Sequence, residues 1–325
     1  LIIGENAFQD CILLEKVNIP SNVREIPWQC FKNCTSLKEV SIPYGVTTIS
    51  SNAFEATALQ SVSIPDSTTD IGGAAFINCL DLNEVYIGSG VNHFASSTFS
   101  GCPNLNKLVF SPENQSFISE NNFVYNKEVT EILFAPKNAT GKIIMPDTLK
   151  NVGDSAFAGC SLITAIVLPE SVTGIGSSAF KDCVNLAEIN LPAGITSLTW
   201  GVFENCHSLV HINIPASVTS IDSYAFAGCT RLSDVVIPDG VEFIGNRAFL
   251  ECKALDYIVL PNSVVTLDDD AFNSCYGLKE VVLSENMTEI SVGVFSHCYN
   301  LYRITIPANI QKIDGGWAFY NCFKL

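Results

Sequence analysis

Hydrophobic and polar residues alternate along this chain in a pattern that repeats about every 23 residues. Phe marks the repeat most clearly, because 13 of the 20 Phe follow one another at spacings of 22 to 24 residues, with one interval of 58. A period of this length predicts a stack of short coils, since one such unit cannot bury its apolar face alone. The Phe residues of this column are Phe8, Phe31, Phe54, Phe76, Phe99, Phe157, Phe180, Phe203, Phe226, Phe249, Phe272, Phe295 and Phe319.

Other apolar residues follow each Phe at fixed offsets. After Phe226, for example, come Leu232, Val235 and Ile237, and then Pro238. The alternating end of this segment predicts a short strand, which Pro closes because it cannot donate to a ladder. Copies of the strand must pair in parallel. A following V-x-x-I segment predicts a second, weaker strand, and the A-F-x-x-C stretch predicts a tight helical or 3₁₀ turn. We therefore expect a mainly β solenoid with little helix.

Cysteine obeys the same period. It lies three residues after Phe in every unit except that of Thr57, so 12 of the 13 Cys share one position. Zinc sites need close Cys pairs, and disulfides need Cβ atoms that approach each other. One Cys per coil fits neither requirement and predicts a column of small buried thiols that meet the backbone in a turn. We expect no metal and no cofactor. The acidic run 268–270 lacks the alternating ligands of a calcium loop and is interpreted as a solvated turn.

The composition and the motifs of the chain argue against several classes of function. The 325 residues include 17 Lys and Arg and 33 Asp and Glu, which gives a formal net charge of -16. This balance argues against binding to nucleic acid, which needs clustered basic residues. The longest apolar runs fall short of the roughly 18 residues that a membrane helix needs. Catalytic motifs such as G-x-S-x-G or a phosphate-binding loop are missing from the sequence, so we do not expect an enzyme.

The full unit reads A-F-x-x-C-x-x-L-x-x-I-x-I/L-P-x-x-V-x-x-I, as in residues 218–238 and 241–261. It resembles the BspA-like class of leucine-rich repeats, which occurs in surface proteins of mucosal bacteria and some protists. The resemblance implies a leucine-rich-repeat solenoid with a parallel sheet on its concave face. It also implies an extracellular or cell-surface protein that binds a host or extracellular-matrix protein, without indicating which one.

The repeat predicts that residues 1–325 form a single solenoid, and we expect it to be a fragment of a longer chain. The interval between Phe99 and Phe157 contains extra residues, which we place at 111–142. Within them, the apolar segments 123–125 and 132–134 flank a polar stretch and predict an irregular, hairpin-like insertion. This insertion is either a binding loop or a degenerate coil.

The residues eight and ten positions after Phe should point outward from the main strand. In three adjacent coils these positions hold Val and Tyr with acidic neighbours, a combination typical of an interface. Val also suits any strand surface through its β propensity, so the pattern has a purely structural alternative. The predicted partner-binding residues are Tyr257, Val259, Val236, Val282, Asp234, Glu280, Tyr86 and His211.

Two other functions stay open at this point. The first is an enzyme on a parallel β-helix that acts on polysaccharide, for which Glu280 and Asp234 are the nearest approach to an acid/base pair. The second is a structural spacer. The main hypothesis is a non-catalytic binding scaffold that contacts a protein partner through the concave sheet.

Overall fold

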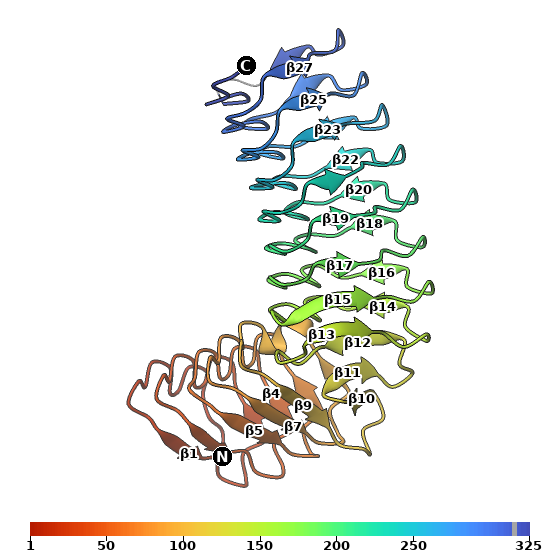
Figure 1. Ribbon diagram of the computed structural model, residues 1–325. Coiled ribbons are helices and arrows are strands. Elements are labelled where there is room, and N and C mark those ends of the chain that lie inside the picture. Colours follow the sequence, from red (N-terminus) through yellow and green to blue (C-terminus); the bar gives the residue numbers. More distant parts are fainter. Residues whose placement is uncertain (314–316) are drawn as a thin grey trace. The chain divides into compact units, whose positions relative to one another are not determined.

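The structure is a computed structural model that describes residues 1–313 and 317–325. The chain forms two compact units, unit 1 (residues 1–139) and unit 2 (residues 140–325). In each unit, short coils of about 23 residues lie one above another, and every coil contributes parallel strands (Figure 1). The fold is therefore a mainly β solenoid, as predicted. Whether the 325 residues form a single solenoid stays a prediction.

The main strands carry the segment that ends before Pro. They pair in parallel at an offset of one repeat, so that Tyr257 lies opposite Glu280 and Val259 lies opposite Val282. In unit 1 they are β1 (Lys16–Asn18), β3 (Glu39–Ser41), β5 (Ser61–Ile64), β7 (Glu84–Ile87) and β9 (Lys107–Phe110). In unit 2 they are β13 (Gly141–Ile144), β15 (Ile163–Val167), β17 (Glu188–Ile189), β19 (His211–Ile212), β21 (Asp234–Val235), β23 (Tyr257–Val259), β25 (Glu280–Val282) and β27 (Arg303–Thr305).

The second strands come from the V-x-x-I segments, as predicted, and are two residues long. They form parallel ladders of their own, such as β2-β4-β6-β8 in unit 1 and β18-β20-β22-β24 in unit 2. In unit 1 they are β2 (Glu25–Ile26), β4 (Thr48–Ile49), β6 (Asp70–Ile71) and β8 (His93–Phe94). In unit 2 they are β14 (Asn151–Val152), β16 (Gly174–Ile175), β18 (Ser197–Leu198), β20 (Ser220–Ile221), β22 (Phe243–Ile244), β24 (Thr266–Leu267), β26 (Glu289–Ile290) and β28 (Lys312–Ile313).

The A-F-x-x-C stretch is a tight turn, but the expectation of helical or 3₁₀ geometry is wrong for nearly every described coil. Among the described residues, only η1 (Ser96–Phe99) is a 3₁₀-helix. Elsewhere the residues two before and two after Phe take left-handed backbone conformations, as Gln29 (φ 54°) and Asn33 (φ 59°) do around Phe31. The backbone amides of Gln29, Phe31 and Asn33 donate to carbonyls of the next coil. Those of Cys30 and Cys34 instead close turns within their own coil. Every second backbone amide of the turn therefore bonds to the next coil, so hydrogen bonds between coils take the place of helical ones.

Phe and Cys form the core of this turn. Phe180, Phe203 and Phe226 are fully buried, and their rings stack with centroids 5.4 and 5.5 Å apart. The thiol of Cys229 donates to the backbone carbonyl of Phe203 in the preceding coil, with Sγ 3.1 Å from the oxygen. The same bond recurs down both units, for example from Cys34 to Phe8 and from Cys298 to Phe272. The predicted column of buried thiols that meet the backbone is confirmed.

The predicted insertion falls largely in unit 1, where the chain departs from the coil pattern. β11 (Phe123–Asn126) pairs in antiparallel fashion with β10 (Phe117–Glu120) on one side and with β12 (Glu131–Phe134) on the other. Val124 and Ile132 are fully buried, and Val124 belongs to the same core as the coils of unit 1. Asn114 anchors the start of the segment, because its buried side-chain amide donates to the carbonyl of Val91 at 2.8 Å. The segment therefore packs as part of the fold.

Removing one ring from the Phe stack tests how much each coil depends on it. We expect Phe226→Ala to lower the free energy of unfolding by about 3–5 kcal/mol, because the change leaves a large cavity in a closely packed interior. Urea denaturation followed by circular dichroism measures the change. Tyr44→Ala is the control, since Tyr44 is 77% exposed, and should change stability by about 0.5 kcal/mol or less. Equal effects of the two substitutions would contradict the stack as the core.

The thiol column predicts sensitivity to alkali. Burial raises the pKa of the Cys275 thiol to about 12 and also raises the pKa of Cys229, Cys252 and Cys298 in the same column. An unfolded thiol ionises near pH 8.5, so above that pH the unfolded state releases protons that the folded state keeps. Stability is then fully present below about pH 8 and falls by roughly 1.4 kcal/mol per pH unit for each buried thiol.

Urea titrations at several pH values between neutrality and the pKa of the buried thiols measure this loss. Cys229→Thr is the matched variant, because Thr57 already occupies the Cys position in another coil and donates to a backbone carbonyl there. Its stability should fall less steeply with pH than that of the unmodified chain. A free energy of unfolding that does not change with pH over this range would rule out the explanation.

Candidate functional site

The candidate site lies on the main strands of unit 2, where side chains alternate between the core and the surface. In β23, Ile258 is 1% exposed, whereas Tyr257 and Val259 on either side of it are 49% and 42% exposed. We call the outward side chains of β19, β21, β23, β25 and β27 and of the residues next to them the main-strand face. The inward Ile and Val fix its orientation, because a slip of one residue would bury the polar side chains.

The three predicted valines occupy successive coils of this face. Val259 and Val282 are direct partners in the ladder, and Val236 stands at the same position of the coil before, just after β21. All three are exposed, with Val236 at 72%. Adjacent coils lie about 4.8 Å apart, so the three side chains form a continuous apolar stripe. The exposure of the predicted residues is as expected, and their role in binding stays a prediction.

Glu280 lies beside the stripe and is held by the next coil. The Tyr302 hydroxyl donates to its carboxylate at 2.6 Å, and the Arg303 guanidinium lies 3.7 Å from it. The hydrogen bond to this carboxylate raises the pKa of Tyr302. Tyr302 is 52% exposed and was not among the predicted residues. Tyr302 stands seven residues after Phe295 and directly after the buried Leu301. Counting the outward positions seven residues after each Phe, as well as those eight and ten after it, could have identified it from the sequence.

Asp234 and His211 form a second polar pair on this face. The two residues are partners in the ladder of β19 and β21, and His211 Nδ1 lies 2.8 Å from the Asp234 carboxylate. Both side chains are more than half exposed. Asp234 and Glu280, the pair considered for an enzyme, are each engaged by a different neighbour, and the coil of Tyr257 separates them. They stand two coils apart, as counted from the sequence.

Tyr86 belongs to unit 1, apart from the other predicted residues. It is 38% exposed on β7, and its hydroxyl donates to the carboxylate of Glu84 at 2.8 Å. The ammonium group of Lys107 on β9 donates to the same hydroxyl and lies 4.7 Å from the ring centroid. This hydrogen bond raises the pKa of Lys107. The main strands of unit 1 thus carry an aromatic residue whose polar end is satisfied by its own and the next coil.

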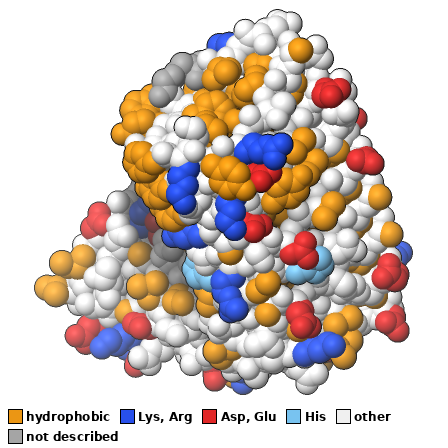
Figure 2. All heavy atoms as spheres, turned by 45° about the horizontal axis from the view of Figure 1, so that its top comes forward, with side chains coloured by type: hydrophobic (Ala, Val, Ile, Leu, Met, Phe, Trp, Pro, Cys, Tyr) orange, Lys and Arg blue, Asp and Glu red, His pale blue; other side chains and the backbone are white. Residues whose placement is uncertain are grey.

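Large apolar side chains also gather at the last coil of unit 2, in the upper part of Figure 2. Trp317 and Phe323 are 54% and 76% exposed there. The rings of Tyr276, Tyr299 and Phe323 stack in succession, with centroids 4.9 and 5.5 Å apart. Because these rings cover one another in the same way as the buried Phe column, we attribute them to the stacking of coils rather than to binding.

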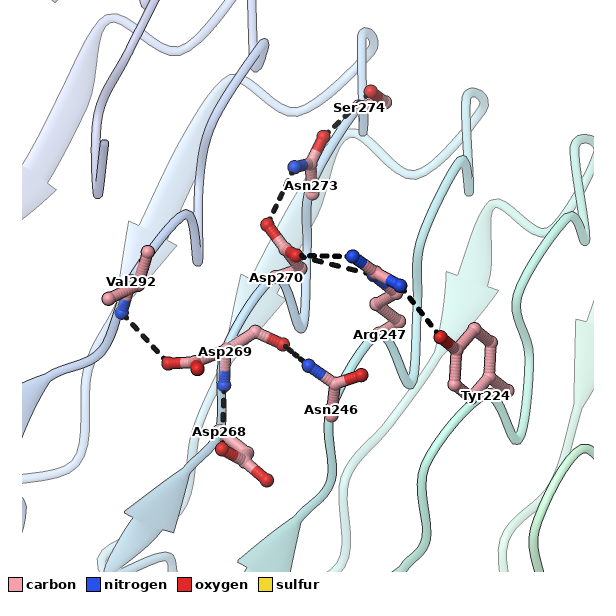
Figure 3. Close-up of polar contacts among 9 residues, drawn as sticks. All are labelled: Tyr224, Asn246, Arg247, Asp268, Asp269, Asp270, Asn273, Ser274 and Val292. Atoms are coloured by element: carbon pink, nitrogen blue, oxygen red, sulfur yellow. Dashed lines mark hydrogen bonds and ion pairs between the residues drawn. The ribbon is translucent and has the colours of Figure 1, made fainter.

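The acidic run 268–270 is a structural turn (Figure 3). Asp270 accepts two bonds of 3.2 Å from the guanidinium of Arg247 and one of 2.8 Å from Asn273. Asp269 accepts a bond from the amide of Val292 in the next coil at 3.0 Å. These carboxylates therefore connect coils. In the part of the chain that the structure describes, no group of three His, Cys, Asp or Glu side chains is arranged to hold a metal ion.

The comparison with known families agrees with this geometry. The sequence pattern of the BspA type leucine-rich repeat region matches residues 1–130, 127–215 and 200–325, with six copies. The chain belongs to this family. No helix among the described residues has both the length and the apolar character to cross a membrane.

Solved structures of bacterial leucine-rich repeat proteins are similar to the chain. A leucine rich cell surface protein from Faecalibacterium prausnitzii is 26% identical over 85% of this chain and 61% of its own, with a TM-score of 0.55. A leucine-rich repeat protein from Bacteroides ovatus is 25% identical over 94% of this chain and 82% of its own, with a TM-score of 0.53. One from Eubacterium ventriosum is 22% identical over 98% and 79%, with a TM-score of 0.64.

The chain thus spans about three fifths of the length of the F. prausnitzii protein. No curated protein sequence matches it significantly. The comparisons support a leucine-rich repeat scaffold of the kind typical of protein-binding surface proteins.

The Asp270 contacts yield a stability prediction. We expect Asp270→Ala to lower the free energy of unfolding by about 1 kcal/mol, because Arg247 and Asn273 lose a half-buried partner between two coils. Thermal denaturation measures the shift. Asp239→Ala, at an aspartate in a turn of the same unit, is the control and should leave the midpoint almost unchanged. A midpoint for Asp270→Ala equal to that of the control would show that these bonds do not hold the coils.

Proposed function

We propose that this chain is a non-catalytic scaffold that binds a protein partner through the main-strand face of unit 2. The observation that supports the proposal is the exposed stripe of Val236, Val259 and Val282 beside Tyr257 on paired strands. Aromatic and apolar side chains with a polar rim are typical of the centre of a protein interface. Because the strands are already paired with their neighbours, their backbone loses little freedom when a partner binds.

The charges around the stripe indicate the kind of partner. Glu280 and Asp234 border it, and the whole chain carries a formal net charge of -16. Complementary potentials favour a partner surface with an apolar strip bordered by Lys and Arg. A nucleic acid would be repelled by the same acidic character.

The place of action is part of the proposal. A similar protein from F. prausnitzii is described as a cell surface protein, and BspA-type repeats resemble those of surface proteins that contact hosts. We place the chain outside the cell or at its surface, with a host or extracellular-matrix protein as partner and adhesion as the outcome. An enzyme acting on polysaccharide has less support, because the nearest candidate pair of carboxylates is engaged separately.

Binding of the purified chain to immobilised collagen, laminin and fibronectin and to intact host cells tests this proposal. Val259→Asp and Tyr257→Ala should each weaken binding at least about tenfold, since loss of a central interface side chain costs more than roughly 1.4 kcal/mol. Val265→Asp is the matched control, because Val265 is 53% exposed in the same unit but lies outside the main-strand face. Binding that survives both substitutions, or that the control weakens equally, would remove the proposed site.

A further inference from the structure

The turns of unit 2 contain a hollow that the main-strand face does not use. It has a volume of about 470 Å³ and lies across three consecutive coils, on the side of the Phe and Cys column. The middle coil places Ala227, Gly228 and Thr230 there, where the coils on either side place larger residues such as His207 and Lys253. Small side chains between two larger rows leave a depression, and its volume falls in the range of small-molecule sites.

Gly228 makes the hollow possible. Its φ of +74° is a left-handed conformation that favours glycine, and a Cβ at this position would clash with the Asn205 amide oxygen. The carbonyl of Gly228 lies 2.8 Å from His207 Nδ1. A carbonyl only accepts, so Nδ1 carries the proton, and Nε2 is the acceptor of the neutral ring. The hollow thus has a fixed wall whose hydrogen-bonding pattern is set by the backbone.

The charged groups around the hollow are balanced. Glu251 and Lys253 form an ion pair of 2.9 Å on one wall, and Glu204 on the other wall lies 2.8 Å from Lys181. The hydrogen bond that Lys253 donates to the Glu251 carboxylate raises the pKa of Lys253, which is therefore charged at neutral pH. A ligand finds donors and acceptors here without a net charge to neutralise.

Tyr224 lines the hollow and is held in place by neighbouring coils (Figure 3). The guanidinium of Arg247 donates to its hydroxyl at 2.8 Å, and the ring of Trp200 lies 5.7 Å from the Tyr224 ring. Because the hydroxyl accepts from Arg247, its own proton can be donated to a ligand. Ala227 and Leu250 supply apolar surface among these polar groups.

From this arrangement we propose that the hollow binds a neutral sugar residue of a glycan. Tyr224, His207 and Glu251 line the same hollow and supply donors and acceptors for the hydroxyl groups of a hexose, and the paired charges give an acidic sugar no free cation to bind. The open shape and the mixed polar and apolar lining predict a dissociation constant in the millimolar range for one sugar residue. This site does not depend on the protein-binding proposal, because it lies on the turns and uses other residues.

Saturation-transfer NMR of the intact chain with the methyl glycosides of glucose, galactose, mannose and N-acetylglucosamine tests the site, with the methyl glycoside of N-acetylneuraminic acid as the acidic probe. Thr230→Tyr should fill the hollow and reduce the signal to background. The fold tolerates Tyr at this position, because Tyr276 and Tyr299 occupy it in other coils of the same unit. Ala227→Leu is a second filling variant, chosen because Leu250 holds the equivalent position in the adjacent coil.

Ser161→Tyr places the same side chain at the same position of a distant coil and should keep the full signal. Val259→Asp should also keep it, which separates this site from the protein-binding face. A signal for a neutral glycoside that both filling variants abolish and both controls retain supports the proposal. Absence of transfer to all neutral glycosides, transfer to the acidic probe alone, or a signal that survives Thr230→Tyr and Ala227→Leu would overturn it.

Discussion

The tight turn around each buried Phe is the constraint on which the rest of the structure depends. The turn reverses the chain over a buried ring, so it places backbone carbonyls where water cannot reach them. A buried carbonyl without a partner is costly. The Phe203 carbonyl accepts from the amide of Cys206 in its own coil, and the thiol of Cys229 adds a second, weak donor from the next coil. A small side chain with one donor suits this position, since the buried Thr57 occupies it in one coil and donates to the Phe54 carbonyl.

The left-handed residues belong to the same arrangement. A non-glycine residue with positive φ costs roughly 1–2 kcal/mol, yet Tyr224 and Arg247 adopt φ values of 61° and 56°. Each then donates its amide to a carbonyl of the next coil, at 3.0 Å in both cases. The bond between coils therefore stabilises a conformation that the residue alone would avoid. It also turns the side chains at these positions toward the surface, which is how Tyr224 reaches the hollow.

Much of this fold could be predicted from the sequence, because the same apolar, Cys and Pro positions recur in nearly every repeat. The spacing of Phe, Cys and Pro indicated coils, parallel strands and buried thiols, and Val236, Val259 and Val282 could be placed outward by counting from Phe. Three features could not be read in this way. The left-handed residues include Arg, Tyr, Glu and Val, which show no local preference for that conformation. Tyr302 joins the candidate face through a bond to Glu280 on another coil. The hollow arises from a difference between neighbouring coils at Gly228, whereas a repeat pattern describes only what the coils share.

Core and surface use separate positions in each coil, and under the proposed function this separation lets a shared scaffold present different faces. Buried columns hold nearly the same residue in every coil. The outward column eight residues after Phe instead holds Glu188, His211, Asp234, Tyr257, Glu280 and Arg303 in successive coils of unit 2. Because the backbone at this column is fixed by the core on its other side, substitutions there change the charge and shape of the face without moving the strand. The repeat can therefore predict that such a face is present, while its charge and shape depend on residues that differ from coil to coil.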